Sequence, residues 1–484
     1  MPERAKYSAE PIDDCRWRIA KRGAMRTDGL IFANAAMMEA MRQDPCLDQV
    51  ANVAHLPGIV GSAMAMPDIH WGYGFPIGGV AAFDADDGVI SPGGVGYDIN
   101  CGVRLLRTSL TRTQLNQDPA LLGALLDALY AHVPSGVGSA RRDLTLGPKA
   151  LSQVMVQGAA WAVAQGMGEA ADLDHCESRG TLPGADPQIP SKRAYERGRD
   201  QLGTLGSGNH FCEIGWVDAV FDAATAQSFG LAMDTLTIFI HTGSRGLGYQ
   251  VCDDHLATMI KAASRYAITL PDRQLCCAPL GSPEGRAYLA TMTAAANFAF
   301  ANRQVITHQV RQACSDVLGP SVKVDLVYDV AHNIAKMERH LVDGASRRLC
   351  VHRKGATRAL PPHHPELPPG YATTGQPVLV PGDMGRYSYV LAGCAAAATE
   401  TFTSCCHGAG RLLSRSAALK AAKGRKITEE LSARGVTVRA YSHKTLAEEM
   451  PAAYKDVAHV VDVVEAAGIA RRVVRLRPLG VVKG

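Results

Sequence analysis

The segment Ser404–Arg411 places a histidine, His407, between two cysteines and a run of small residues that ends in an arginine. We expect a helix over Arg411–Ala422 and therefore free backbone N–H groups and cations beside the imidazole. Such surroundings attract phosphate. A histidine that meets phosphate can act as a nucleophile toward phosphorus. A buried, hydrogen-bonded histidine beside a small-residue turn is the more ordinary explanation, and the local pattern leaves both open.

Five potential metal ligands are distributed along the chain. Asp98 and Cys101 share a glycine-rich loop, whose tight turns can bring carboxylate and thiolate to one point. His210, His241 and His332 each lie at the end of an expected strand, and strand ends converge at one edge of a sheet. A thiolate that bridges two divalent ions would use this donor set fully, with zinc, cobalt and manganese all open. Each histidine taken alone is also explained as structural.

Two further loops could contact phosphate. The loop Gly203–Asn209 is rich in glycine and small hydroxyl residues, so its N–H groups could cradle phosphate oxygens. It lacks the Lys-Ser/Thr of a P-loop, which makes the indication weak, and tight turns explain its glycines equally well. Arg245 adds a planar cation in a second glycine-rich loop. Glu213 lies on the strand face opposite His210, where it could contact the fold or a purine edge.

The elements that must position these residues alternate in type, which indicates an α/β fold. Expected strands, rich in β-branched and aromatic residues, are Phe211–Val217, Leu236–Ile240 and Val324–Val330. Expected helices are Asp118–Ala131, Lys149–Ala164, Arg286–Cys314 and Arg411–Ala422. The proline-containing runs Leu182–Ser191 and Leu360–Gly370 are expected to be exposed loops.

Composition narrows the class of protein. With 484 residues, length alone predicts roughly three domains. The 13 cysteines, without a Cys-x-x-Cys pair, predict reduced thiols and no zinc ribbon. No apolar run is long enough for a membrane span, and the charged start, Met1–Arg18, has no secretory signal, so we expect a cytoplasmic location. The net charge of +4 says little, but basic clusters at Arg347–Arg358, Arg411–Lys426 and Arg471–Arg477 could bind a nucleic-acid backbone or simply form solvated faces.

Eight motifs, in order along the chain, resemble the RtcB RNA ligase family. They are Met66–His70, Gly94–Gly102, Gly203–His210, His241–Gly246, His332-Asn333, Arg353–Arg358, Cys406–Arg411 and Val481–Gly484. The resemblance implies a single large α/β domain over residues 1–484, with mixed β-sheets flanked by helices. The active site would lie in a central cleft formed by strand-end loops. The motifs would occupy about residues 66–484, and the segment 1–50 would pack on them.

The resemblance also implies an activity. Members of this family join RNA 3′-phosphate or 2′,3′-cyclic phosphate ends to 5′-hydroxyl ends, using GTP and two Mn²⁺ ions, in tRNA splicing or RNA repair. A histidine matching His407 takes GMP from GTP, and the GMP then passes to the RNA 3′-phosphate. The expected partner is RNA with such ends, with an archease-like activator as a candidate second partner, no membrane, and a monomeric chain.

Residue roles follow by position in the motifs. Asp68 would orient His407. Cys101 would bridge two ions, with His210 and His241 at one and Asp98 and His332 at the other. The residues expected at GTP or GMP are Asn209, Phe211, Glu213, Asp383, Ser388, Gly408, Ala409, Gly410, Tyr454 and Lys483. Those expected at RNA or phosphate are Arg245, Lys354, Arg411 and Arg415.

One position departs from the commonest family pattern, and two other functions compete with ligation. Asp383 stands where many members carry serine, which puts details of guanine recognition in doubt. The metal ligands alone would also suit a metal-dependent phosphodiester hydrolase, but such an enzyme needs neither a spare nucleophile at His407 nor the guanine-contacting Glu213 and Lys483. An RNA-binding protein without activity would not need to keep every ligand.

Overall fold

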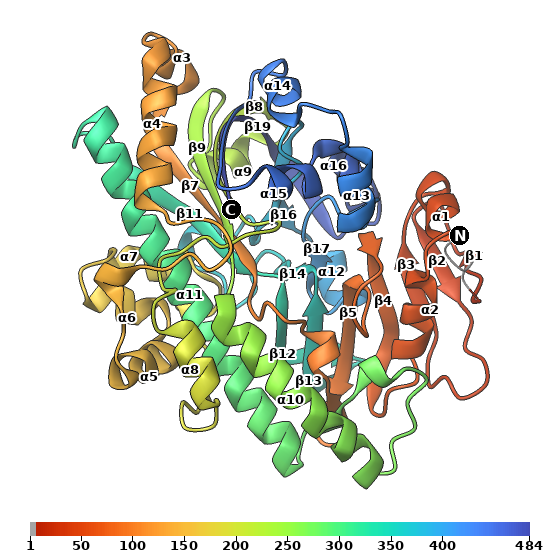
Figure 1. The fold of residues 1–484 in the computed structure, drawn as a ribbon. Helices are drawn as coiled ribbons and strands as arrows, with labels where there is room; N and C mark the ends of the chain where they lie inside the picture. The colour runs from red at the N-terminus through yellow and green to blue at the C-terminus, as the bar shows by residue number, and fades with distance from the viewer. Residues whose placement is uncertain (1–5) are drawn as a thin grey trace.

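Two large mixed β-sheets form the centre of the protein in the computed structural model, which describes residues 6–484. Figure 1 shows the sheets side by side, with helices around them. The strands of the first sheet, in spatial order, are β1 (Glu10–Pro11), β2 (Arg16–Ile19), β3 (Gly29–Phe32), β4 (Ile59–His70), β5 (Ile77–Asp84), β13 (Ala345–Lys354) and β12 (Asn333–Val342). The N-terminal strands β1–β3 extend this sheet, because β3 pairs with β4 in parallel.

The second sheet carries most of the strand ends that matter for the site. Its order is β11 (Val324–Ala331), β7 (Gly102–Thr111), β9 (Thr235–Thr242), β8 (Phe211–Val220), β19 (Ala470–Lys483), β16 (Ser388–Gly393) and β15 (Pro377–Val380). The short strand β18 (Thr437–Ala440) pairs in parallel with the last part of β19. Two small ribbons pair β6 (Val89–Ile90) with β10 (Ala278–Pro279) and β14 (Ala356–Arg358) with β17 (Ser404–Cys406).

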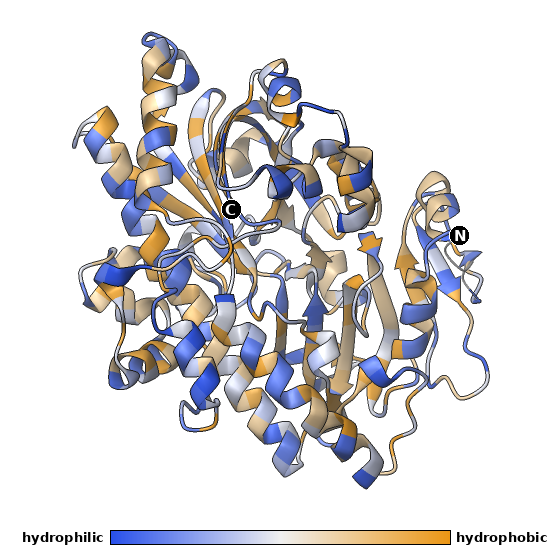
Figure 2. Ribbon diagram, in the orientation of Figure 1, coloured by the Kyte–Doolittle hydropathy of each residue, from blue (hydrophilic) through white to orange (hydrophobic). Residues whose placement is uncertain are grey.

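The helices cover the outer faces of the sheets. Figure 2 shows hydrophobic and hydrophilic residues interspersed along these helices. They are α1 (Ala35–Met41), α2 (Cys46–Val53), α3 (Arg112–Leu115), α4 (Pro119–His132), α5 (Pro148–Gln157), α6 (Ala159–Ala164), α7 (Ala170–Asp174), α8 (Lys192–Gly198), α9 (Ala223–Ser228), α10 (Arg245–Arg265), α11 (Pro283–Leu318), α12 (Ala395–Glu400), α13 (Arg415–Ala421), α14 (Ile427–Ser432), α15 (His443–Glu448) and α16 (Val457–Ala466). None of the helices within residues 6–484 is both long and apolar enough to cross a membrane.

Helix α11 is the central helix of the fold, with 36 residues. Ser282 caps its start by accepting a hydrogen bond from the Gly285 N–H, and Pro283 occupies its first turn, where a missing N–H costs nothing. Gly319, at φ +90°, ends it. Sequence analysis predicted this helix over a shorter range, because its two ends are marked by caps and not by apolar periodicity.

Two helix predictions were wrong. The expected helix Lys149–Ala164 is two helices, α5 and α6, because Gly158 has φ +57° and its Cα packs against the Gly180 carbonyl. The helix expected from Arg411 begins at Arg415, where the Ser414 hydroxyl accepts a hydrogen bond from the Ala417 N–H. His407 therefore precedes an irregular segment and not a helix N-terminus.

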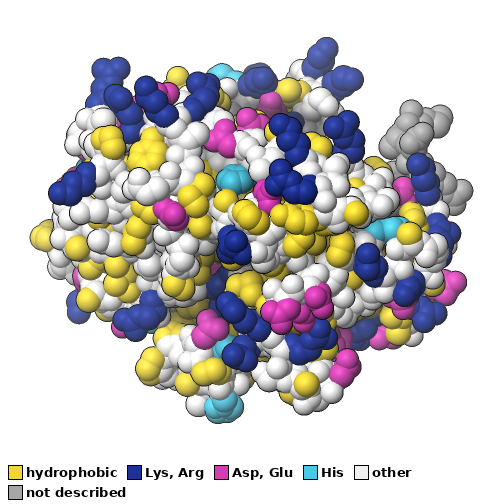
Figure 3. Space-filling view, turned by 90° about the horizontal axis from the view of Figure 1, so that it is seen from below, with side chains coloured by type: hydrophobic (Ala, Val, Ile, Leu, Met, Phe, Trp, Pro, Cys, Tyr) yellow, Lys and Arg dark blue, Asp and Glu magenta, His cyan; other side chains and the backbone are white. Residues whose placement is uncertain are grey.

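The three basic clusters of the sequence are largely neutralised by acidic partners. Arg353 is fully buried and its guanidinium makes two hydrogen bonds to Glu338. Arg475 and Arg477 both pair with Asp218. On the face in Figure 3, Lys and Arg side chains alternate with acidic and hydrophobic ones. The expectation that the stretch Arg347–Arg358 forms an exposed RNA-binding surface is wrong for its buried half.

Candidate active site

The starts of β7 and β8 and the ends of β9 and β11 lie at one edge of the second sheet. Gly102, at the start of β7, lies in register between Thr242 of β9 and Ala331 of β11. Cys101 and His332 are the next residues outward, and the His332 N–H donates to the Cys101 carbonyl at 2.9 Å. His332 is also the single residue between β11 of the second sheet and β12 of the first. The site therefore lies where the two sheets meet.

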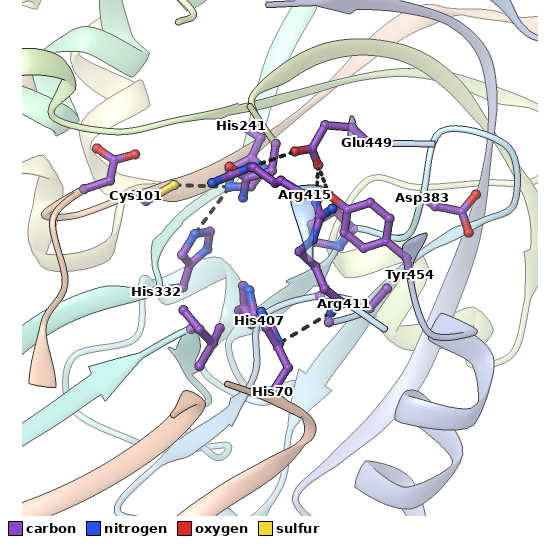
Figure 4. Close-up of a pocket in the computed structure, with 18 of the residues that line it drawn as sticks. His70, Cys101, His241, His332, Asp383, His407, Arg411, Arg415, Glu449 and Tyr454 are labelled. Carbon is purple, nitrogen blue, oxygen red and sulfur yellow. Dashed lines mark hydrogen bonds and ion pairs between the residues drawn. The ribbon is translucent and has the colours of Figure 1, made fainter. Parts of the chain in front are cut away.

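Five donor side chains converge at this edge, and we call them the ligand cluster: Asp98, Cys101, His210, His241 and His332. The Cys101 Sγ lies 3.4 Å from the His210 Nε2 and 3.3 Å from the His241 Nε2. The His241 and His332 Nε2 atoms are 3.3 Å apart, and the His210 Nε2 is 2.9 Å from the Asp98 carboxylate. The donors form two groups that share the thiol (Figure 4).

The grouping of donors differs from the expected one. The structure joins His210 with Asp98 and His241 with His332, whereas the resemblance paired His210 with His241. Both arrangements keep Cys101 as the shared ligand. The grouping follows the observed contacts, in which the Asp98 carboxylate lies 2.9 Å from the His210 Nε2.

The protonation of the ligand cluster suits a metal. The His210 Nδ1–H donates to the Leu205 carbonyl at 3.0 Å, which orients the ring so that its Nε2 points at Asp98 and Cys101. Burial lowers the pKa of His241 and His332 well below the usual value, so both imidazoles are neutral. Burial and Asp98 raise the pKa of the Cys101 thiol, and a bound cation would reverse that shift. Imidazole, thiolate and carboxylate in two groups of three fit two divalent ions with open positions.

A buried arginine on α11 holds the strand ends that carry the ligand cluster. The Arg303 guanidinium makes two hydrogen bonds to Asp329 of β11, at 2.8 and 2.9 Å. It also donates to the carbonyls of Asn100, beside Cys101, and of Thr242, beside His241. Arg303 and Asp329 are completely buried. One side chain thus adds a buried link between the ends of three strands that are already paired in the sheet.

His407 follows β17 and lies beside the ligand cluster. Its Nδ1 is 2.5 Å from the Asp68 carboxylate, and its ring centroid is 5.0 Å from that of His332. Asp68 is fully buried. Burial raises the pKa of its carboxyl, but the charge and hydrogen bonds of His407 outweigh burial and lower it overall. Asp68 is therefore an anion that accepts a hydrogen bond from the His407 Nδ1–H. The Nε2 of His407 has no hydrogen-bond partner within residues 6–484 and lies on the cleft.

The backbone around His407 is not free to bind phosphate in the way the sequence suggested. The N–H groups of His407 and Gly408 both donate to Asp68, and that of Ala409 donates to the Pro381 carbonyl. Gly410 has φ +71°, and a Cβ there would lie 2.1 Å from the Asp68 carbonyl. These N–H groups are already bonded within the chain, so they are not free to bind a phosphate.

A cleft of about 700 Å³ runs past His407 and the ligand cluster. Most of the residues expected at the site line it: Asp98, Cys101, Asn209, Phe211, Glu213, His241, His332, Lys354, Asp383, His407, Gly408, Ala409, Gly410, Arg411, Arg415, Tyr454 and Lys483. Asp68 and His210 lie directly behind this lining. Ser388 does not reach it, because its hydroxyl accepts a hydrogen bond from the Gly382 N–H.

One wall of the cleft has the chemistry expected for a purine base. Phe211 offers an aromatic face, and the Lys483 ammonium lies 5.7 Å from its centre and donates to the His210 carbonyl. Burial, helped by repulsion from Asp383, raises the pKa of Glu213 to about 8. The Glu213 carboxyl has no hydrogen-bond partner in the described part of the chain, and it faces the cleft. A ligand that donates hydrogen bonds would satisfy it.

Two arginines that line the cleft are already paired, in a group that we call the Glu449 cluster: Arg411, Arg415, Glu449 and Tyr454. Glu449 is almost fully buried and binds Arg411 at 2.8 Å and Arg415 at 3.3 Å. The Tyr454 hydroxyl also donates to it (Figure 4). Sequence analysis did not identify Glu449, because it lies outside the recognised motifs and a lone glutamate carries no signal in a single sequence.

The other two residues expected at RNA or phosphate, Lys354 and Arg245, also have partners within the chain. The Lys354 ammonium donates to the carbonyls of Tyr73, Phe75 and Gly93, and burial lowers its pKa to about 7. The Arg245 guanidinium donates to the Thr204 hydroxyl and lies outside the cleft lining. In this structure Lys354 therefore fixes the loops beneath the cleft, and Arg245 packs against the Gly203–Asn209 loop.

A cleft with two overlapping sets of metal ligands and a histidine oriented by a buried carboxylate has the make-up of a metal-dependent phosphoryl-transfer enzyme. Residues 49–484 match the family model described as tRNA-splicing ligase RtcB. The chain belongs to the RtcB family.

Curated relatives agree with this assignment over nearly the whole chain. The tRNA-splicing ligase RtcB of Thermococcus kodakarensis is 52% identical over 98% of both chains. That of Archaeoglobus fulgidus is 51% identical over 98% of both chains. The RNA-splicing ligase RtcB of Mycobacterium tuberculosis is 53% identical over 90% of this chain and 100% of its own.

Proposed function

We propose that this protein is an RNA ligase that joins RNA 3′-phosphate or 2′,3′-cyclic phosphate ends to 5′-hydroxyl ends, with GTP and two Mn²⁺ ions. The observation that carries the proposal is His407, whose Nδ1 is held by Asp68 while its Nε2 faces the cleft beside His332. A hydrolase would need an activated water here and no such nucleophile. The names of the relatives support a role in tRNA splicing or RNA repair.

The first step that these residues support is transfer of GMP to His407. The neutral Nε2 attacks the α-phosphorus of GTP, a P–N bond forms, and the bond to pyrophosphate breaks. Asp68 accepts the Nδ1–H and offsets the positive charge that develops on the ring. When bound, the metal ions supply charge that stabilises the pentacoordinate phosphate and its leaving group.

Two transfers then complete the reaction. An oxygen of the RNA 3′-phosphate attacks the phosphorus on His407, which releases the neutral imidazole and leaves the RNA end capped with GMP. The 5′-hydroxyl of the second strand attacks the RNA phosphorus, a phosphodiester forms and GMP leaves. A cyclic phosphate must first be opened by water to a 3′-phosphate. Arg411 and Arg415 would hold phosphate after exchanging Glu449 for it.

The part of the cleft formed by Phe211, Glu213 and Lys483, which we call the guanine wall, supports GTP as the cofactor. An ionised Glu213 can accept from the two N–H groups on the guanine edge, Lys483 can donate to its carbonyl, and Phe211 and Tyr454 can pack on its faces. Asp383 would add a second acceptor in place of a serine. We further propose that residues 1–484 act as one catalytic domain, as a monomer in the cytoplasm, with an archease-like activator as a candidate partner.

Labelled GTP tests the nucleophile directly. Incubation with α-labelled GTP and Mn²⁺ should leave acid-labile, alkali-stable label on the denatured wild-type protein and none on His407→Ala. The matched control is His459→Ala, an exposed histidine on α16. Label retained by His407→Ala would refute the nucleophile. Failure of the wild type to join 3′-phosphate and 5′-hydroxyl RNA would refute the ligase and favour the hydrolase.

A further inference from the structure

Three tyrosines in mutual ring contact and one tryptophan that lines the same cleft have no part in the proposed chemistry. We call them the aromatic rim: Trp71, Tyr73, Tyr97 and Tyr249. Trp71, Tyr73 and Tyr97 line the same cleft as His407. Tyr97 directly precedes the metal ligand Asp98 in the chain. The rim is thus continuous with the candidate active site.

Three rings of the rim, those of Tyr73, Tyr97 and Tyr249, form an ordered series. Tyr97 and Tyr249 are stacked, with centroids 4.8 Å apart and planes at 24°. Tyr73 meets Tyr97 edge-on at 5.7 Å. The Arg197 guanidinium lies over the outer side of this series, 4.9 Å from the Tyr249 centroid. Stacked aromatic rings flanked by a cation are the usual surface for unpaired nucleobases.

Exposure separates the rim from the hydrophobic core. Trp71 is 56% exposed and Tyr249 is 44% exposed, whereas Trp161, in the core, is 5% exposed. A large apolar ring left open at the mouth of a cleft has unused contact area. Backbone contacts hold the rim in place, because Lys354, buried beneath it, donates to the Tyr73 carbonyl. Because Tyr97 and Arg197 already lie over the Tyr249 ring, the open ring face of the rim is mainly that of Trp71.

We propose that the aromatic rim stacks the terminal nucleobases of an RNA end and so places the adjacent phosphate or hydroxyl at the ligand cluster. The inference rests on the proposed function and extends it. The proposed function places the RNA phosphates in the cleft, and the rim adds a binding site for the nucleobases next to them. Stacking accepts any base, so the rim would bind RNA ends of any sequence. The base belongs either to the strand with the 3′-phosphate or to the strand with the 5′-hydroxyl.

Binding of short RNAs to the Mn²⁺-loaded protein tests the rim. We would measure dissociation constants by fluorescence anisotropy for a single-stranded 3′-phosphate RNA and, separately, a 5′-hydroxyl RNA. Trp71→Ala should weaken binding of one of the two strands about tenfold, the size of a lost base–aromatic stack, and Trp71→Phe should restore most of it. Tyr249→Ala should act on the same strand. The strand affected identifies the end that the rim holds.

Phe221→Ala is the matched control, because Phe221 is an aromatic residue with 49% exposure just beyond β8, at the end away from His210. It should leave both dissociation constants unchanged. An RNA with an abasic terminal nucleotide should bind wild type and Trp71→Ala equally. Equal binding of normal RNA by these two proteins, or an unchanged loss with abasic RNA, would overturn the rim and leave Trp71 as a surface for another class of partner.

Failure of the rim and failure of the ligase give different results. Wild-type protein that takes label from GTP and joins RNA ends, with no effect of Trp71→Ala on RNA binding, refutes the rim alone. Wild-type protein that binds RNA through Trp71 but joins no ends refutes the ligase alone. For each variant, the rate of ligation divided by the rate of GMP transfer reports the RNA step separately, because GMP transfer to His407 involves no RNA.

Discussion

The ligand cluster and the Glu449 cluster face each other across one cleft, yet they are prepared for their ligands in opposite ways (Figure 4). In the ligand cluster, Arg303 holds the backbone beside Cys101 and His241, so that the donor atoms, including the Asp98 carboxylate, converge on one another. In the Glu449 cluster the cations that could hold phosphate are paired with a buried carboxylate.

This contrast predicts two kinds of binding. Divalent ions should enter the ligand cluster with little rearrangement, because its geometry is fixed by buried groups. Phosphate must compete with Glu449 for Arg411 and Arg415 and should therefore bind more weakly than two free arginines would allow. An exchangeable partner also suits a reaction in which three different phosphates occupy the site in turn.

The largest expected effect comes from Asp68, which holds His407. Asp68→Asn keeps the shape of the side chain but cannot hold His407 in the required tautomer, so single-turnover GMP transfer should slow by about 10³- to 10⁴-fold. The rate of GMP transfer is measured as the rate at which label passes from α-labelled GTP to the protein. Asp253→Asn, an exposed carboxylate on α10, is the control. A rate within threefold of wild type would show that Asp68 is structural only.

Arg303→Met should disturb the positions of the donor atoms in the ligand cluster, because it removes the bonds to the Asn100 and Thr242 carbonyls. Mn²⁺ affinity, measured by calorimetry or electron paramagnetic resonance, should fall about 10- to 100-fold, as for other lost supports of metal ligands. Arg104→Met is a close control, because Arg104 is equally buried and binds the same Asp329 at 2.7 Å but contacts neither Asn100 nor Thr242. Both variants should lower the melting temperature. Equal loss of Mn²⁺ affinity in both would mean that general destabilisation is the cause.

Glu449→Gln tests whether Glu449 competes with phosphate for the two arginines of the Glu449 cluster. Removal of the competing charge frees Arg411 and Arg415, so inorganic pyrophosphate should bind several-fold more tightly, while Mn²⁺ affinity should not change. Equilibrium dialysis at fixed ionic strength measures the first and calorimetry the second. Glu448→Gln, the neighbouring carboxylate, is the control. Weaker pyrophosphate binding would show instead that Glu449 holds the arginines in their binding positions.

The smallest effect is a pH dependence at the guanine wall. Glu213 has its folded-state pKa raised to about 8 from an ordinary 4.5, so the stability that its proton contributes is present below pH 4.5 and is lost as pH rises through about 8. Glu213→Gln should therefore gain a few degrees of melting temperature over wild type near pH 9 and little near pH 5. Parallel melting curves for the two proteins between these values would contradict the raised pKa.

Sequence alone predicted the parts of the site that depend on strand ends. His210, His241 and His332 could be placed together because apolar runs that end in histidine are visible in one chain, and a regular sheet aligns such ends. The two groups of ligands could not be assigned, since they depend on the contact between the Asp98 carboxylate and His210 in the fold. The family resemblance, not residue spacing, connected Asp68 to His407.

The errors have a common physical cause. The glycines and arginine after His407 indicated a helix start, but Asp68, distant in sequence, takes the first two N–H groups of that segment. The basic run Arg347–Arg358 indicated a surface, but Glu177 and Glu338 neutralise it inside the fold. Tertiary partners decide both cases, and local patterns do not contain them.

Strand β19 lies between β8 and β16 and supplies Lys483 to the guanine wall. During translation, β8 and β16 are therefore made long before the strand that separates them. Until β19 is inserted, each has an unpaired edge, and such edges attract other chains. We expect the nascent protein to depend on chaperones late in its synthesis, and ligase activity to appear only in the same step that closes the sheet.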